Sequence, residues 1–144
     1  MTIFDLWAKA VPFQSVVTHG IVSGVVAQQV LSLFLPTGTR DQLCRGLNVT
    51  DAQLEQFVGY FTSLHDIGKI NYYFQAMQED RKQEMEAAGL AEMELPDLHF
   101  RHERESFLAL KKIWDPIDHR NGVKLAEILG AHHQGKRTSL TQPQ

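Results

Sequence analysis

The chain has little cysteine, no excess of positive charge and no long unbroken run of apolar residues. Cys44 is the single cysteine among 144 residues, which excludes an internal disulfide framework and a cysteine-based zinc site. The formal net charge is −3 with neutral histidines, whereas proteins that capture nucleic acid by electrostatics alone are usually basic. If the chain meets DNA or RNA, we therefore expect it to do so through a metal site or with help from a basic partner.

The most apolar stretch, residues 16–35, is interrupted by polar side chains and predicts a buried helix in preference to a membrane span. The N-terminus has an early acid, Asp5, and no basic segment before an apolar core, so it does not read as a signal peptide. We expect a cytoplasmic protein without a membrane partner. The length and the apolar content of 43% suit one domain over residues 1–144.

Helical periodicity dominates the chain, and no segment has the alternation of a convincing strand, which predicts an all-α fold. Six helices are expected, over residues from about 15 or 18 to 34, 41–47 with Thr39 as the cap, 50–66, 72–74, about 103–114 and 123–133. A solvated helix followed by a loop is expected over 78–96, and a turn at Asn121-Gly122. Thr50 and Gln53 match a capping box, and Gly68 is the expected stop of the third helix.

Three sets of apolar residues are predicted to face the core because they recur at helical spacing. In the first helix the stripe contains Val22, Val26, Val30 and Leu33, and His19 continues it by one turn. In the two last helices the inward sets are Phe107, Leu108 and Ile113, followed by Leu125, Ile128 and Leu129.

The polar cluster His65-Asp66 with Gly68-Lys69 stands between an apolar run and an aromatic run. Neutral imidazole suits transition metals, and a carboxylate can bridge two ions. Adjacent helical residues point roughly 100° apart, so His65 and Asp66 alone cannot enclose a metal. Further ligands must come from elsewhere in the chain.

The remaining histidines lie where such ligands would be needed, at the ends of other predicted helices. His19 begins the first helix, His102 begins another, and His132-His133 end the last. Because helix ends converge at one pole of an all-α domain, these groups could meet around Asp66. Five imidazoles and one carboxylate suffice for two ions, and ions roughly 3.5–4 Å apart clamp the attacking and leaving oxygens in phosphodiester hydrolysis.

Each of these residues also has a simpler interpretation. His19 could be a hydrogen-bonded core histidine, and His65-Asp66 could be a helix cap or a surface ion pair. His102 could be exposed in a polar loop, because His99 and His102 flank Arg101. His132-His133 could complement a helix dipole, and Lys69 could be a surface lysine after a helix.

The ordered motifs carry a resemblance: His19, Leu64-His65-Asp66-Ile67-Gly68-Lys69 followed by Phe74-Gln75, Phe100-Arg101-His102-Glu103 and Ala131-His132-His133-Gln134-Gly135. Together they resemble the HD superfamily of metal-dependent phosphohydrolases. Within it, the chain is most similar to the HD nuclease domain of the CRISPR-associated type I helicase-nuclease. The resemblance spans residues 7–135, and it implies an HD-type helical bundle with a metal site at the converging helix ends.

The resemblance also implies roles for individual residues. Asp66 would bridge the metals beside His65, His19 would complete one ligand set, and His102, His132 and His133 would form the other. Lys69 would lie near the scissile phosphate or pair with a carboxylate, and Glu103 would orient His102. The implied cofactor is one or two divalent transition-metal ions, namely manganese, iron, nickel or cobalt, with magnesium possible.

The implied substrate is single-stranded DNA, supplied by a helicase domain or subunit after a CRISPR guide-RNA surveillance complex opens the target. The family has a further aspartate well after the double histidine, whereas this chain has none after Asp118. We therefore expect either the N-terminal portion of a longer protein or a shortened homologue with an incomplete site near His19. Two other functions stay open: an HD phosphohydrolase acting on nucleotides or cyclic nucleotides, and an impaired HD module that binds or regulates a partner.

Overall fold

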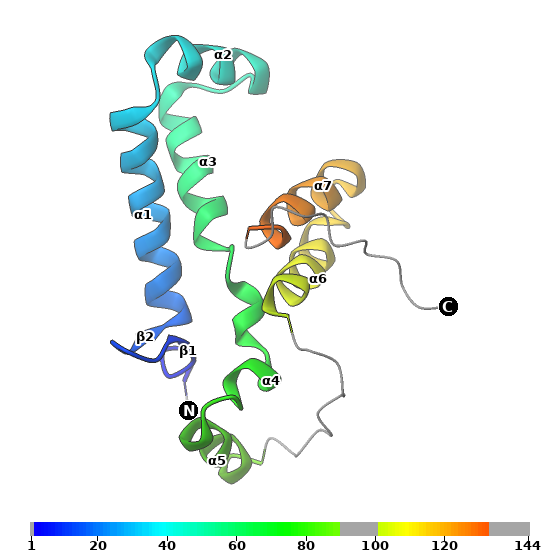
Figure 1. The fold of residues 1–144 in the computed structure, drawn as a ribbon. Coiled ribbons are helices and arrows are strands. Elements are labelled where there is room, and N and C mark those ends of the chain that lie inside the picture. Colours follow the sequence, from blue (N-terminus) through cyan, green and yellow to red (C-terminus); the bar gives the residue numbers. More distant parts are fainter. Residues whose placement is uncertain (1, 90–100, 133–144) are drawn as a thin grey trace.

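A computed structural model describes residues 2–89 and 101–132, and most of these residues lie in helices (Figure 1). The elements are β1 (Trp7–Lys9), β2 (Gln14–Ser15), α1 (Val16–Phe34), α2 (Thr37–Leu47), α3 (Asp51–Ser63), the 3-10 helix η1 (Ile67–Ile70), α4 (Tyr72–Gln75), α5 (Glu79–Ala87), α6 (His102–Trp114) and α7 (His119–Gly130). The all-α fold class is confirmed. The expectation of no strand needs a small correction, because β1 and β2 form a short antiparallel pair.

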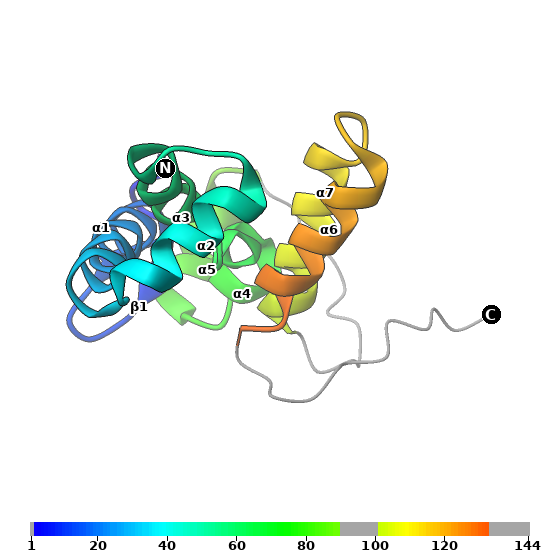
Figure 2. The ribbon, with the colours of Figure 1, turned by 90° about the horizontal axis from the view of Figure 1, so that it is seen from above.

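The helices form two side-by-side pairs (Figures 1 and 2). In one pair α1 packs along α3, and in the other α6 packs along α7. The 3-10 helix η1 packs against α6 and thereby joins the two pairs. The segment that carries His65 and Asp66 consequently lies at the junction of the two pairs.

Helices α1 and α3 approach closely because glycines line their contact. A Cβ atom added at Gly20 would lie 2.5 Å from the Ser63 carbonyl oxygen, and one added at Gly24 would lie 2.6 Å from the Gly59 carbonyl oxygen. Real Cβ atoms do not approach backbone oxygen so closely, so the two helices could not pack at this distance with larger residues. The contact face of α1 is therefore its small-residue face.

The predicted apolar stripe of α1 is wrong as a core face. The exposed fraction of the predicted core residues lies between 45% and 74% for Val22, Val26, Val30 and Leu33. They lie on the side of α1 away from Gly20 and Gly24, since residues two apart on a helix point in nearly opposite directions. By length and composition α1 would be capable of spanning a membrane, a property that core helices of soluble proteins share.

The second pair contains the main apolar cluster, made of Phe107, Leu110, Trp114 and Ala126. Leu125 and Leu129 pack against it as predicted. The other predicted inward residues are wrong: Leu108, Ile113 and Ile128 are 44%, 50% and 67% exposed. Residues at spacings of three and four from Phe107 form the buried face of α6, which places Leu110 and Trp114 inside instead.

Helix boundaries differ from the predictions at two turns. Asn121-Gly122 does not form a turn but lies in the first turn of α7, where the Asp118 side chain caps the helix by accepting from the Asn121 amide at 3.1 Å. Helix α2 begins at Thr37 after Pro36, so Thr39 is a helical residue and not the cap. The predicted end of the last helix at His133 lies outside the described residues.

Two other predicted elements are confirmed. The capping box is present, with Thr50 and Gln53 exchanging side-chain to backbone hydrogen bonds at the start of α3. The short helix near Tyr72 is α4. Helix α5 falls within the predicted solvated segment and buries Met85, which is 2% exposed; the rest of that segment, after residue 89, lies outside the described residues.

Candidate metal centre

The turn after α3 positions His65 and Asp66. Helix α3 ends at Ser63, before these two residues, and Gly68 lies within η1, so the prediction that Gly68 stops the helix is wrong. The glycine is required for a different reason: a Cβ atom at Gly68 would lie 2.1 Å from the His102 carbonyl oxygen. Only a residue without a side chain lets η1 approach α6 this closely.

A buried serine fastens this turn to α6. The Ser106 hydroxyl, in a residue that is 0% exposed, accepts a hydrogen bond from the Gly68 amide at 2.9 Å. The same hydroxyl donates to the His65 carbonyl oxygen at 2.9 Å. Because it pairs backbone groups on both sides of Asp66, Ser106 holds the carboxylate-bearing turn in one position relative to His102.

The Asp66 carboxylate is the centre of the site and is 2% exposed. On one side its Oδ2 atom lies 3.2 Å from His19 Nε2 and 3.3 Å from His65 Nε2. The same oxygen lies 2.7 Å from Lys69 Nζ. The interpretations of His65-Asp66 as a surface pair and of Lys69 as a surface lysine are therefore excluded, since the Lys69 side chain is only 10% exposed.

The other carboxylate oxygen faces the second helix pair. Asp66 Oδ1 lies 3.3 Å from His102 Nε2 and 3.2 Å from His132 Nε2. Glu103 Oε2 lies 3.7 Å from His102 Nδ1, which agrees with the predicted orienting role of Glu103. The two oxygens of one carboxylate thus serve two groups of imidazoles.

The far nitrogens of the rings show which nitrogen carries hydrogen. The Nδ1 atom of His65 lies 2.7 Å from the Thr62 carbonyl oxygen, and that of His132 lies 2.6 Å from the Leu129 carbonyl oxygen. A carbonyl can only accept, so we assign the hydrogen to Nδ1. In a neutral ring the Nε2 lone pair then faces Asp66, so the contact becomes favourable when Nε2 is protonated and donates to the carboxylate, or when a cation lies between the two groups.

The protonation preferences follow from this geometry. Burial alone would raise the pKa of the Asp66 carboxyl, but hydrogen bonds from the surrounding imidazoles and ammonium outweigh burial and hold that pKa well below its ordinary range. Burial lowers the pKa of His19, and attraction to Asp66 only partly offsets it. Burial also lowers the pKa of His132, but hydrogen bonds with Asp66 and with the Leu129 carbonyl leave it raised. The carboxylate therefore stays ionised near neutral pH.

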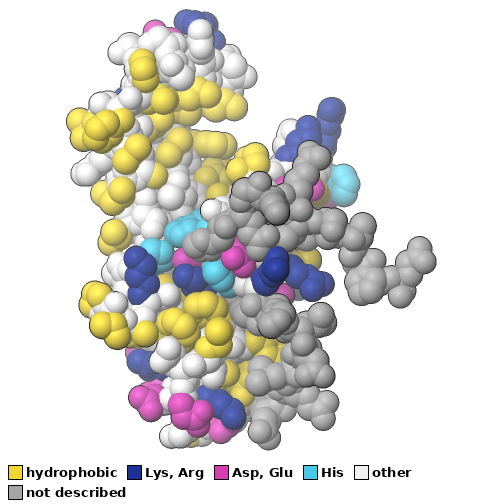
Figure 3. All heavy atoms as spheres, viewed as in Figure 1, with side chains coloured by type: hydrophobic (Ala, Val, Ile, Leu, Met, Phe, Trp, Pro, Cys, Tyr) yellow, Lys and Arg dark blue, Asp and Glu magenta, His cyan; other side chains and the backbone are white. Residues whose placement is uncertain are grey.

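The donor set fits divalent transition-metal ions. His19, His65 and Asp66 form one group, and Asp66, His102 and His132 form another; in each group the ligand atoms lie within 4.8 Å of one another. Imidazole nitrogen with carboxylate oxygen is a common combination for such ions. Five of the six predicted metal ligands are thus brought together, while His133 lies outside the described residues. Figure 3 shows a group of histidine side chains at mid-height of one face, with another histidine apart from it.

Comparison with known proteins bears on the identity of this centre. The sequence matches the family described as "Cas3, HD domain" over residues 7–144. The chain belongs to this family. It is also 31% identical over 131 residues to "CRISPR-associated endonuclease/helicase Cas3" of Thermus thermophilus, an alignment that covers 89% of the chain and 14% of that protein. No solved structure matches the chain.

Membership of the Cas3 HD family implies a metal-dependent nuclease domain and confirms the resemblance inferred from the ordered motifs. The chain spans about one seventh of the length of its Thermus relative. In this Cas3 HD domain the candidate ligands are the imidazoles that surround Asp66.

Sequence reasoning missed how Ser106 and Gln75 support the turn that carries His65 and Asp66. Ser106 gives no signal in the sequence, because a serine within an amphipathic helix usually faces solvent. Gln75 is 1% exposed, and its side chain bonds the Trp7 backbone and the Lys69 carbonyl oxygen. Phe74-Gln75 belongs to the central motif that resembles the family, but the motif does not predict that the Gln75 side chain is buried or which groups it bonds.

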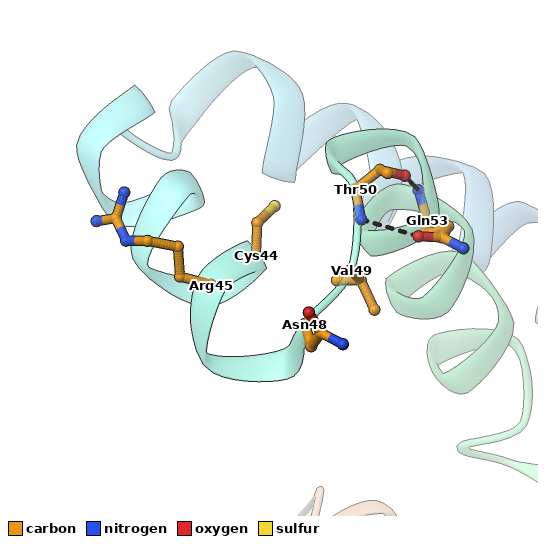
Figure 4. A pocket seen from close by; sticks show the side chains of 6 residues that line it. All are labelled: Cys44, Arg45, Asn48, Val49, Thr50 and Gln53. Atoms are coloured by element: carbon orange, nitrogen blue, oxygen red, sulfur yellow. Dashed lines mark hydrogen bonds between the residues drawn. The ribbon is translucent and has the colours of Figure 1, made fainter.

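A separate pocket of this HD domain lies between α2 and the start of α3 (Figure 4). It is lined by Cys44, Arg45, Asn48, Val49, Thr50 and Gln53. The side chains of Thr50 and Gln53 are engaged in the capping box, and no histidine lines the pocket. The pocket is therefore not part of the metal centre.

Proposed function

We propose that this chain is the metal-dependent nuclease domain that hydrolyses phosphodiester bonds of single-stranded DNA in CRISPR type I interference. The observation that carries the proposal is the convergence of four imidazole Nε2 atoms, each 3.2–3.3 Å from an oxygen of one buried carboxylate. Divalent manganese, iron, nickel or cobalt bound there would supply Lewis-acid activation of water and stabilise charge on the phosphate.

The residues of the chain have distinct tasks in this proposal. Asp66 stays ionised and offers one oxygen to each group of imidazoles. The backbone carbonyls of Thr62 and Leu129 fix the ring orientation of His65 and His132, which is how outer hydrogen bonds commonly orient ligating imidazoles.

The proposed DNA substrate is consistent with the surface around the centre. Figure 3 shows Lys and Arg side chains flanking the histidines on the same face, where they would attract a phosphodiester backbone. The net charge of −3 suits a domain that receives its strand from a partner instead of capturing it alone. The proposed partners are a helicase domain or subunit and the guide-RNA surveillance complex, in line with the name of the Thermus relative, which combines endonuclease and helicase.

Cleavage of circular single-stranded DNA tests the proposal. The chelator-treated chain is incubated with the circle after addition of manganese, nickel or magnesium, alongside Asp66→Ala, the near-isosteric Asp66→Asn and the exposed control Asp41→Ala. We expect metal-dependent cleavage by the wild type and Asp41→Ala. Both Asp66 variants should lose at least about 100-fold in rate, because they remove a ligand shared by both groups.

The result also separates the alternatives. Stoichiometric metal binding without cleavage of DNA would overturn the nuclease proposal and support a module that binds a partner. Hydrolysis of nucleotides or cyclic nucleotides, with the DNA circle left intact, would support a small-molecule phosphohydrolase instead.

A further inference from the structure

The two halves of the metal centre differ in one charged group. On the Oδ2 side of Asp66, the Lys69 ammonium lies 2.7 Å from the oxygen that His19 and His65 also face. On the other side, Asp66 Oδ1 pairs within the described residues with the imidazoles of His102 and His132. The Glu103 carboxylate adds a second negative charge, 3.7 Å from His102 Nδ1. One half therefore already contains a positive charge, and the other has additional negative charge.

The Lys69 ammonium is held in place from several directions. Its Nζ atom lies 3.4 Å from the Ala8 carbonyl oxygen in β1 and 5.4 Å from the centre of the Phe74 ring. The Lys69 backbone is fixed as well, because Gln75 donates a hydrogen bond to its carbonyl oxygen at 2.6 Å. A lysine held in this way cannot move away from Asp66 Oδ2 without breaking contacts with β1 and the aromatic ring.

We propose that Lys69 makes the two metal sites unequal by competing for Asp66 Oδ2. The site at His102, His132 and Oδ1 binds a divalent ion first and tightly. The site at His19, His65 and Oδ2 binds a second ion weakly, because that ion must displace the ammonium or accept its repulsion. Lys69 is thus a positioning residue that acts on metal occupancy through Asp66. This inference rests on the metal-binding part of the proposed function.

Manganese binding to the purified chain tests this order without measuring catalysis. The chelator-treated protein is titrated with manganese by calorimetry, and free manganese is counted by electron paramagnetic resonance. For the wild type we expect two classes of site that differ at least about tenfold in Kd, since a nearby unit charge changes ion affinity strongly at low effective dielectric. His19→Ala should remove the weak class, and His102→Ala should remove the tight class.

Substitution of Lys69 tests the cause of the difference. Lys69→Met should tighten the weak class at least about tenfold and leave the tight class within about threefold of wild type. Lys69→Arg keeps the positive charge, so the two classes of site should stay apart in this variant. A merely structural role for the side chain would not predict that Lys69→Met tightens the weak class while Lys69→Arg leaves it unchanged. Circular dichroism checks the fold of each variant. If Lys69→Met does not fold, the pair His19→Ala and His102→Ala still decides the order.

Several outcomes would overturn the inference. Equal affinities at the two sites of the wild type, or loss of the tight class in His19→Ala, would show that the ammonium does not set the order. An unchanged weak class in a folded Lys69→Met chain would do the same. If the protein has two unequal metal sites but cleaves no DNA, this inference stands and the nuclease proposal fails. If the protein cleaves DNA but has two sites of equal affinity, the nuclease proposal stands and this inference fails.

Discussion

At the scale of single residues, one buried aspartate determines the chemistry of the molecule. An ionised carboxylate is costly to bury unless cations or hydrogen-bond donors surround it. Asp66 is surrounded by four imidazoles and one ammonium, and its pKa is held well below the ordinary range although burial alone would raise it. Protons and metal ions are therefore alternative cations at this carboxylate, and they compete for the same imidazole nitrogens.

This competition predicts a pH dependence of metal affinity. Asp66 remains ionised, so the competing protons are those of the imidazoles, and the raised pKa of His132 strengthens the competition at its ring. We expect manganese affinity to fall as the pH is lowered from about 8 to about 6, by up to about tenfold per pH unit for each proton displaced. Calorimetry across this range measures the slope, and a flat profile in a folded protein would contradict it.

Protonation of His132 should raise the free energy of unfolding of the metal-free chain, whereas the same protonation weakens metal binding. Its pKa is raised in the folded state, so its contribution to the free energy of unfolding is fully present below the unfolded pKa of about 6.5. The contribution is lost as the pH rises through the folded pKa. Raising the pH thus removes a stabilising proton and prepares the same nitrogen for a metal.

At the scale of helices, glycines decide which faces meet. The α1–α3 contact passes through Gly20 and Gly24, and the branched residues on the opposite side of α1 stay exposed. Periodicity located the helix correctly but assigned the wrong face to the core, since it counts apolar side chains and ignores how closely two backbones can approach. Close approach brings His19, the residue directly before Gly20, beside His65 in the turn after α3, with ring centroids 5.3 Å apart.

Alanine substitutions separate close approach from helix propensity. Gly24→Ala should lower the free energy of unfolding by about 1–3 kcal/mol, because its Cβ atom would lie 2.6 Å from the Gly59 carbonyl oxygen and force the helices apart. Gly46→Ala in α2, where a Cβ atom meets nothing within 4 Å, should raise it by about 0.5–1 kcal/mol. Urea unfolding measures both, and equal stabilities of the two variants would refute the packing argument.

At the scale of the whole molecule, the metal centre joins the two helix pairs. His19 comes from α1, His65 and Asp66 from the turn after α3, His102 from α6, and His132 from just after α7. These residues are separated by as many as 113 positions along the chain. An ion bound by Asp66, His102 and His132 would link the turn after α3 to the pair of α6 and α7, and it would bind only the folded chain.

Metal should therefore stabilise the fold as a whole. At a free manganese concentration of about 100 times Kd, the free energy of unfolding should rise by about 2.7 kcal/mol. For a domain of this size the melting temperature should then rise by roughly 8 °C, and chelation should reverse the rise. Differential scanning calorimetry of Asp66→Ala is the control. An equal rise in that variant would show that the stabilising ion binds elsewhere.

The sequence by itself determined the helical class, the capping box at Thr50 and the set of side chains suited to metal. Those features are local or chemical: periodicity, a four-residue cap and the residue types of four ordered motifs. Only the tertiary structure decided that Asp66 divides its two oxygens between two groups of imidazoles and that Lys69 occupies one of them. Pair distances across helices depend on backbone approach at Gly24 and Gly68, and a periodicity that counts apolar side chains does not register such contacts.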